Sequence, residues 1–521
     1  MKNNKTLIFI RKNMVWFLLL AIVALAIFFR FYQLNTLPPG LHPDEAANGL
    51  DIFKILENRD LRIIYNTNGP REALFFYFQA VFVLAMGNTI TALRVAPALF
   101  GVLSVIVVFF ATKEWFNRRT ALITAFFFAI NPWVVTIQRD GFRASLVPLF
   151  IALILLFGAK AYKTNKKIYY ILAAVSLGLG FYTYTAFSMI LTAIFAGFIY
   201  MLIFRRSWLM SNWKKLILSM AVFGAVMSPL LYTTIKDPGG STARAGGTSF
   251  LNKNLNNGQP IQTLLSGTAK TILQYNYIGD SNNRHNFSGQ PLLNIFVGIM
   301  FILGLVMCLF NFAKPKYALL LVVFGSMLLP SLLTAEGLPH ALRSIGTAVP
   351  VLIMAGMGVN YLLYMWYQTF PINRLARITG LFLVCVLMAL SLIQAYRQYF
   401  VSWAQDAKTY EAYNEGSVAI AKYLISTNNP ARSNYVIMGG YEANTIEYLT
   451  HKKSQYSLLD TAQLRDLPIA NTTNILIIVP AGADHDKQVA IVKAKFPNAT
   501  VKDFYSDFNG KLLFSACEIN Q

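Results

Sequence analysis

The chain has 521 residues, of which 55% are hydrophobic and only 13% are charged, and its formal net charge is +22. Soluble domains carry about 25% charged residues, so this composition argues against a soluble enzyme, and the high hydrophobicity also excludes a disordered chain. Three cysteines in a chain of this length exclude a small disulfide scaffold.

Apolar runs of membrane-spanning length recur along the first 400 residues. A spanning helix needs about 20 apolar residues to cross the hydrocarbon core. We therefore expect an α-helical polytopic membrane domain over residues 1–396. Its eleven predicted spans lie at about 14–34, 92–112, 120–138, 146–162, 168–185, 186–204, 215–233, 291–311, 317–334, 344–366 and 379–396.

Basic residues gather in every second connection between these runs. They are Lys2, Lys5, Arg11, Lys12, Lys113, Arg118, Arg119, Lys160, Lys163, Lys166, Lys167, Arg205, Arg206, Lys214, Lys215, Lys314, Lys316, Arg374 and Arg377. The positive-inside rule places such connections in the cytoplasm. This membrane topology explains the net positive charge, so no nucleic-acid partner is needed to account for it. We expect an integral protein of the plasma membrane with a cytoplasmic N-terminus and, after eleven spans, an extracytoplasmic C-terminus.

Residues 397–521 differ from the rest of the chain, because twelve acidic and twelve basic side chains balance there. Helical and extended patterns alternate along this segment. We predict a small soluble α/β domain outside the membrane. Its expected elements are helices near 411–426 and from about 484, and strands near 435–438, 475–479, 499–506 and 511–517.

An acidic pair, Asp44 and Glu45, follows the first predicted span in a long outer connection, 35–91. Pro43 directly before it suits the first turn of a helix, where carboxylates complement the helix dipole. A carboxylate at the membrane surface can also act as a general base. The residues alone leave both interpretations open.

Residues 73–87 form a second apolar segment in the same connection. About fifteen residues are short for a span, and a crossing here would place Lys113, Arg118 and Arg119 on the outer side. We therefore predict an interfacial or re-entrant helix that could guide a lipid tail toward the carboxylates.

Several short motifs together resemble a known family. The sequence Pro43-Asp44-Glu45-Ala46 after the first span is similar to the signature loop of the C superfamily of membrane glycosyltransferases (GT-C). The group of protein O-mannosyltransferases and bacterial aminoarabinose transferases is the most similar. Further motifs stand in the same order, namely residues 94–101, 116–121, Asn131-Pro132 and 138–143. The resemblance covers about residues 14–180.

This resemblance implies a GT-C fold, a sugar donor on a polyprenyl phosphate, and single-step transfer to an acceptor hydroxyl outside the membrane, with inversion at the anomeric carbon. Asp44 matches the catalytic carboxylate of the family and would take the acceptor proton, and Glu45 matches its neighbour. Some relatives carry a second Asp shortly after an Arg. Here Ala144 and Ser145 follow Arg143, and Asp140 precedes it. Whether Asp140 takes that role, caps a helix or pairs with Arg139 stays open.

Negative charge builds on the phosphate leaving group implied by the family, so cations are expected around it. We expect the donor phosphate at Arg139, Arg143, His340 and Arg343, and further substrate contacts at Arg71, Asp140, Arg284 and His285. Each also has an ordinary structural explanation. An outer Arg can extend to lipid headgroups, and Arg71 can pair with Glu72.

The sequence contains no His or Cys spacing typical of a zinc site. The Asp484-His485-Asp486 run is better explained by a helix start. We therefore expect no required metal or other cofactor.

Two other function classes compete with the transferase. A transporter or flippase of polyprenyl-linked sugars would place binding groups near the midplane, often in inverted repeats, whereas the acidic pair here lies at the surface. A structural partner that binds glycan through residues 397–521 would leave the carboxylates and cations unexplained. For the transferase, protein, lipid and glycan hydroxyls are all candidate acceptors, and membrane lipids surround the spans.

Overall fold

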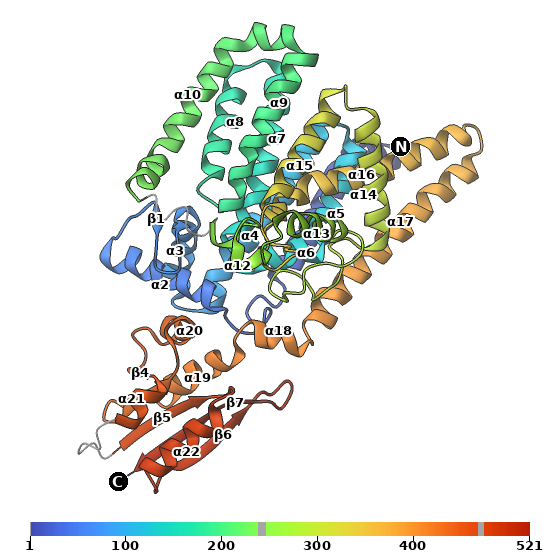
Figure 1. The fold of residues 1–521 in the computed structure, drawn as a ribbon. Helices are drawn as coiled ribbons and strands as arrows, with labels where there is room; N and C mark the ends of the chain where they lie inside the picture. The colour runs from blue at the N-terminus through green and yellow to red at the C-terminus, as the bar shows by residue number, and fades with distance from the viewer. Residues whose placement is uncertain (1, 238–245, 467–473, 521) are drawn as a thin grey trace. The chain divides into compact units, whose positions relative to one another are not determined.

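The computed structural model describes residues 2–237, 246–466 and 474–520. The chain divides into two compact units (Figure 1). The helical unit contains residues 1–32, 62–75 and 95–403, and the mixed unit contains residues 33–61, 76–94 and 404–521. Two segments of the expected membrane domain, 33–61 and 76–94, thus cluster with the C-terminal residues. This differs from the division expected at residue 396.

The helical unit consists almost entirely of helices. A two-stranded antiparallel ribbon pairs β1 (Ile64–Tyr65) with β2 (Arg71–Glu72). The helices are α1 (Lys2–Phe31), α4 (Ile90–Trp115), α5 (Arg118–Ile130), α6 (Pro132–Arg139), η1 (Arg143–Leu146), α7 (Val147–Thr164), α8 (Lys167–Gly180), η2 (Thr185–Met189), α9 (Ile190–Phe204), α10 (Arg206–Lys236), α12 (Lys253–Asn256), α13 (Pro260–Leu273), α14 (Ile295–Phe310), α15 (Pro315–Leu332), η3 (Ile345–Thr347), α16 (Ala348–Thr369), α17 (Arg374–Tyr396) and η4, a π-helix (Arg397–Trp403).

Eight helical segments of the described chain are long and apolar enough to cross a membrane, or nine if the bent pair α5 and α6 is one span. The protein is therefore an integral membrane protein with multiple spans. Two of the eleven predicted spans correspond to shorter apolar helices, α8 and α14, of 14 and 16 residues. The predicted short apolar helix after the first outer loop is α3 (Leu74–Met86).

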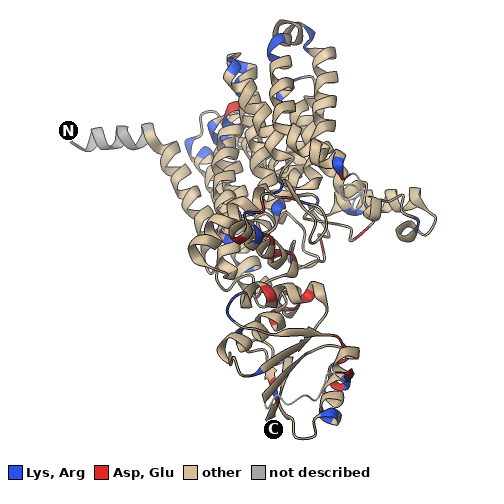
Figure 2. Cartoon of the chain, turned by 90° about the vertical axis from the view of Figure 1, so that its left-hand side faces the viewer, with Lys and Arg blue, Asp and Glu red and all other residues tan. Residues whose placement is uncertain are grey.

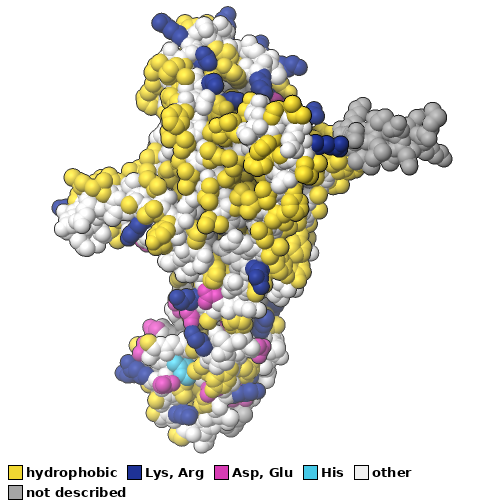
Figure 3. Space-filling view, turned by 90° about the vertical axis from the view of Figure 1, so that its right-hand side faces the viewer, with side chains coloured by type: hydrophobic (Ala, Val, Ile, Leu, Met, Phe, Trp, Pro, Cys, Tyr) yellow, Lys and Arg dark blue, Asp and Glu magenta, His cyan; other side chains and the backbone are white. Residues whose placement is uncertain are grey.

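The surface of the helical unit fits a lipid environment. Large apolar side chains point outward, and Met220 and Phe310 are 72% and 87% exposed. Figure 3 shows hydrophobic side chains over most of the helical surface, whereas Lys and Arg in Figure 2 lie mainly at the ends of helices. This is the arrangement expected of membrane-spanning helices with charged connections.

The break between α5 and α6 has a local cause. Asn131 ends α5 and also caps α6, accepting a hydrogen bond from Val134 N–H at 3.2 Å. Pro132 occupies the first position of α6, has no N–H to continue the helix and disfavours helical backbone in the residue before it. The two helices therefore meet at a bend of 57°.

The mixed unit contains a five-stranded sheet in the order β4-β3-β5-β7-β6. The first three strands are parallel, and β7 is antiparallel to both β5 and β6. The strands are β3 (Ser433–Ile437), β4 (Ser457–Leu459), β5 (Asn474–Pro480), β6 (Thr500–Tyr505) and β7 (Leu512–Asn520). The helices are α2 (Pro43–Asn58), α18 (Ala407–Ala412), α19 (Glu415–Ser426), α20 (Gly440–Thr450), α21 (Thr461–Asp466) and α22 (His485–Lys495), together with most of α3.

The core of this sheet is the run of apolar residues in β5, which is buried on both faces. Ile475, Ile477 and Val479 pack with Cys517 and Ile519 of β7 in one cluster. A continuous apolar run is typical of a central strand. The expected strands and helices of this segment are confirmed, while β4, α20 and α21 were not predicted.

Candidate active site

A capping box builds the first turn of α2. His42 precedes the helix, and its Nδ1 accepts a hydrogen bond from Asp44 N–H at 3.1 Å. The Glu45 carboxylate reaches back to the N–H of His42 at 3.5 Å, and Pro43 stands at the first helical position. These bonds satisfy N–H groups that have no partner inside the helix. The start of α2 therefore fixes the backbone of the acidic pair.

Glu45 forms an ion pair with the buried guanidinium of Arg94. The side chains of Glu45 and Arg94 are both fully buried, and Arg94 Nε and Nη2 each lie 3.1 Å from one Glu45 carboxylate oxygen. Arg94 also donates to the carbonyls of Pro38 and Gly40 at 2.7 Å each. One guanidinium thus holds both the carboxylate and the loop that leads into α2. This bidentate geometry suits a structural role for Glu45.

Asp44 has a different environment. Its side chain is 38% exposed, and its Oδ1 accepts a hydrogen bond from the Tyr441 hydroxyl at 2.8 Å. His42 Nδ1 lies 3.7 Å from Asp44 Oδ2, but this nitrogen already accepts the Asp44 N–H, so the imidazole carries its proton on Nε2 and the contact is not an ion pair. Of the two neighbouring carboxylates, Asp44 is the one open to solvent.

Helix α20 supplies Tyr441 and packs closely against α2. Thr445 Oγ1 donates to the carbonyl of Leu41 at 2.9 Å. A Cβ at Gly49 would lie 2.3 Å from the ring of Tyr448, so the glycine permits this close approach. Burial raises the pKa of the Tyr448 phenol above its usual value. No sequence signal marks Tyr441, because only the fold brings a residue almost 400 positions away to Asp44.

Gly40 is the position in this loop where a side chain is least tolerated. Its φ is +115°, and an added Cβ would lie 2.4 Å from the carbonyl oxygen of Tyr413. We expect Gly40→Ala to destabilise the protein by about 1–3 kcal/mol, measured as a lower unfolding temperature of the purified protein. Gly439→Ala is the control, because an added Cβ there meets open space. Equal unfolding temperatures for the two variants would contradict this prediction.

Arg139, an expected phosphate ligand, is fully buried in the helical unit. It donates to the carbonyls of Phe29 and Tyr32, at 2.9 and 2.8 Å, at the end of α1. Arg30 of α1, in turn, donates to the Ala129 carbonyl at 2.8 Å, at the end of α5. Each arginine thus binds carbonyls at the C-terminal end of another helix, where the carbonyls have no partner within that helix. Arg30 was not singled out from the sequence.

Arg143 forms an ion pair with Glu72, and both side chains are mostly buried. Glu72 Oε1 also accepts a hydrogen bond from Thr185 Oγ1 at 3.4 Å. Arg71, beside Glu72 in β2, is buried as well. The acidic partner of Arg143 is therefore Glu72 of the ribbon β1–β2, and not an Asp that follows the Arg closely in sequence, as in some relatives.

His285 and His340 meet in the helical unit around Asp280. Asp280 Oδ2 lies 2.9 Å from His285 Nδ1 and 4.0 Å from His340 Nδ1, and the two imidazole rings stack with centroids 4.7 Å apart. Burial lowers the pKa of the His285 imidazole, and the Asp280 carboxylate opposes this shift. The sequence predicts a substrate contact at His285 and a donor-phosphate contact at His340, and it does not single out Asp280.

The other expected residues lie in three different settings. Arg343 donates to Glu336 Oε2 at 3.1 Å, to the Glu336 carbonyl and to Thr334 Oγ1. Arg284 Nε donates to Asn282 within its own loop at 3.2 Å. Asp140 is fully buried and stands at the C-terminal cap of α6.

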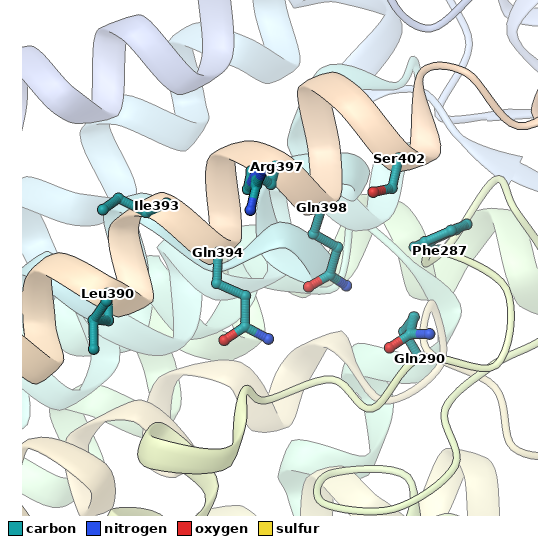
Figure 4. Close-up of a pocket in the computed structure, with 8 residues that line it drawn as sticks. All are labelled: Phe287, Gln290, Leu390, Ile393, Gln394, Arg397, Gln398 and Ser402. Atoms are coloured by element: carbon teal, nitrogen blue, oxygen red, sulfur yellow. The ribbon is translucent and has the colours of Figure 1, made fainter.

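A pocket of about 480 Å³ lies where α17 continues into η4. Figure 4 shows Gln394 and Gln398 extending from this helix toward the loop that carries Phe287 and Gln290, with Arg397 beside them. Arg397 is the one charged side chain of the lining. The pocket can bind a polar group, but it holds no acid or base for proton transfer.

Residues 71–232 match the family model described as dolichyl-phosphate-mannose-protein mannosyltransferase. The resemblance inferred from the sequence motifs is confirmed over residues 71–232, which extends beyond residue 180 into α10, while the Asp44-Glu45 pair lies outside the matched segment. The expected enzyme class, a membrane glycosyltransferase that uses a polyprenyl-phosphate sugar, is the class that the family description names. A comparison with curated protein sequences gives no match.

Two solved structures share the fold of this chain. ArnT from Cupriavidus metallidurans, bound to undecaprenyl phosphate, matches with a TM-score of 0.61 and 11% identity over 96% of this chain and 97% of that chain. The oligosaccharyltransferase AglB from Archaeoglobus fulgidus, in complex with an inhibitory peptide and a dolichol-phosphate, matches with a TM-score of 0.54 and 14% identity over 97% and 74%. At these identities the likeness concerns the fold.

The helical polytopic fold with a small C-terminal α/β domain is confirmed by the helices, the sheet and the ArnT match. The membrane orientation, the residue roles, the acceptor and the expected absence of a metal stay predictions.

Proposed function

We propose that the protein transfers a sugar from a polyprenyl-phosphate donor to an acceptor hydroxyl on the extracytoplasmic side, with inversion and with Asp44 as the general base. The observation that carries this proposal is the difference in environment between the two carboxylates of the acidic pair. Glu45 is fully buried and bound by Arg94, whereas Asp44 is 38% exposed on a rigid helix start. We accordingly assign Glu45 a positioning role.

The proposed step needs one base and one leaving group. The acceptor oxygen forms a bond to the anomeric carbon, the bond from that carbon to the phosphate oxygen breaks, and polyprenyl phosphate leaves. The acceptor proton passes to Asp44. The hydrogen bond from Tyr441 to Oδ1 orients the carboxylate, and the N-terminus of α2 stabilises its negative charge before the transfer. A positioned base contributes about 10²–10⁴-fold to such rates.

For the donor phosphate we propose Arg143 and Arg343 of the helical unit. Both guanidinium groups already bind a carboxylate oxygen, and a phosphate offers anionic oxygen acceptors of the same kind. Glu336 is 58% exposed, and exposed pairs contribute about 0–1 kcal/mol, so exchange for phosphate costs little there. Arg139 is a weaker candidate because its donors serve the carbonyls of α1.

The proposed orientation places the N-terminus in the cytoplasm and residues 404–521 outside the membrane. It requires α8, α14 and the bent pair of α5 and α6 to cross in addition to the eight long spans. At 1.5 Å per residue, helices of 14 and 16 residues reach about 21–24 Å, short of the roughly 30 Å core. Thinning of the bilayer or flanking residues would make up the difference.

Radiolabelled sugars on a pool of polyprenyl phosphates test the proposal in membranes that contain or lack the protein. We expect label to appear in a protein, lipid or glycan fraction only when the protein is present, and that fraction identifies the acceptor. Labelled donor that crosses the membrane of proteoliposomes intact, without transfer, would instead establish a transporter.

A further inference from the structure

We propose that Asp280, His285 and His340 form a binding site for a divalent metal ion, with zinc as the ion whose chemistry fits best. One ligand atom from each residue lies within 4.8 Å of the other two. The first two residues come from the loop between α13 and α14, and the third comes from the segment between α15 and η3. A bound ion would therefore cross-link two outer connections of the helical unit.

The ligand atoms of the three residues lie close together. Around tetrahedral zinc, with bonds of about 2.0–2.2 Å, ligand atoms lie about 3.3 Å apart. Asp280 Oδ2 stands 2.9 Å from His285 Nδ1 and 4.0 Å from His340 Nδ1. Binding would also turn the His340 ring, because its Nδ1 accepts the Arg343 N–H at 3.3 Å and the ring stacks on that of His285. Water can serve as a fourth ligand.

The surroundings hold the carboxylate in place. Asp280 Oδ1 accepts the N–H of Asn282, and Oδ2 accepts the N–H of Ala341, both at 2.8 Å. Trp403 Nε1 donates to the Asn283 carbonyl at 2.8 Å and so anchors the same loop. Asp280 and His285 are 3% and 5% exposed. Such outer hydrogen bonds are the kind that orient metal ligands.

The donor set selects the metal. Two imidazole nitrogens and one carboxylate oxygen suit zinc, whereas magnesium and calcium prefer oxygen ligands alone. Without metal, a proton on His285 Nδ1 bridges to Asp280 Oδ2. An ion at Nδ1 would replace that proton, and the neutral imidazole would then carry its proton on Nε2.

The spacing along the chain explains why no metal motif was visible in the sequence. The three ligands stand five and fifty-five positions apart, and only the fold brings them together. The site belongs to the helical unit and the acidic pair to the mixed unit, and the metal proposal does not depend on the proposed transfer reaction.

The test uses full-length protein in detergent, stripped with chelator and then dialysed against buffered zinc. We expect about one zinc per wild-type chain by elemental analysis, and a rise of about 2 °C or more in unfolding temperature. His340→Gln and His285→Gln should each weaken binding by at least about tenfold. His485→Gln is the matched control, because His485 is also within 2.9 Å of an aspartate, Asp486, and should keep the zinc.

Wild-type protein that retains no zinc and shows no shift in unfolding temperature would overturn the proposal, as would full zinc content in both site variants. If the variants do not fold, Co²⁺ added to the wild type decides. Visible absorption bands of a nitrogen-ligated ion support the site, and a spectrum identical to that of free aqueous Co²⁺ overturns it.

Discussion

Replacing Asp44 by Asn is expected to lower the rate of sugar transfer by about 10²–10⁴-fold while leaving the unfolding temperature nearly unchanged. The amide keeps the shape of the side chain and still accepts the hydrogen bond from Tyr441, but it cannot take a proton from the acceptor hydroxyl. The measurement is the initial transfer rate of purified protein at equal concentrations of folded chain.

Glu57→Gln is the matched control for this prediction. Glu57 lies on the same helix, is exposed to a similar extent at 34%, and binds His451 and Lys452. Its replacement should leave the transfer rate within about threefold of wild type, because it removes only an exposed ion pair. A rate for Asp44→Asn as high as that of Glu57→Gln would remove Asp44 as the base.

Replacing Arg94 by Met is expected to destabilise the protein by about 3–5 kcal/mol, because it leaves the Glu45 carboxylate buried without its cation. The loop carbonyls of Pro38 and Gly40 lose their donor as well. The measurement is the unfolding temperature in detergent, followed by the transfer rate of the fraction that remains folded. Both should fall.

The second variant in this comparison is Arg94→Lys. Lysine keeps the charge but cannot bind both carboxylate oxygens and two carbonyls at once, so it should recover only part of the lost stability. If Arg94→Met unfolds at the wild-type temperature, the buried pair does not hold the start of α2, and the positioning role of Glu45 fails with it.

Much of the fold was predictable from local patterns. The apolar runs gave the positions of the long helices, because burial in lipid needs a continuous stretch of apolar residues. The run at 475–479 gave the central strand of the sheet. The bend at Asn131-Pro132 was not predicted, because the run at 120–138 is apolar on both sides of the break. The segments 33–61 and 76–94 carry no sequence signal for packing with residues 404–521.

The candidate site was predictable only where its residues are neighbours in sequence. Pro43, Asp44 and Glu45 stand in one helix start, so the pattern located them. The division of roles between the two carboxylates depends on Arg94 and Tyr441, which lie 49 and 397 positions from their partners. In the sequence, an arginine indicates a phosphate site whether or not its donors are available. The donors of Arg139 are already bound to backbone carbonyls.

The most direct test of the central claim is a single-turnover assay with a donor labelled in both the sugar and the phosphate. We expect wild-type protein to release one polyprenyl phosphate for each sugar transferred. We expect Asp44→Asn to bind the donor with unchanged affinity while leaving it intact. Cleavage of the donor by Asp44→Asn at the wild-type rate, or movement of intact donor without cleavage by the wild type, would contradict it.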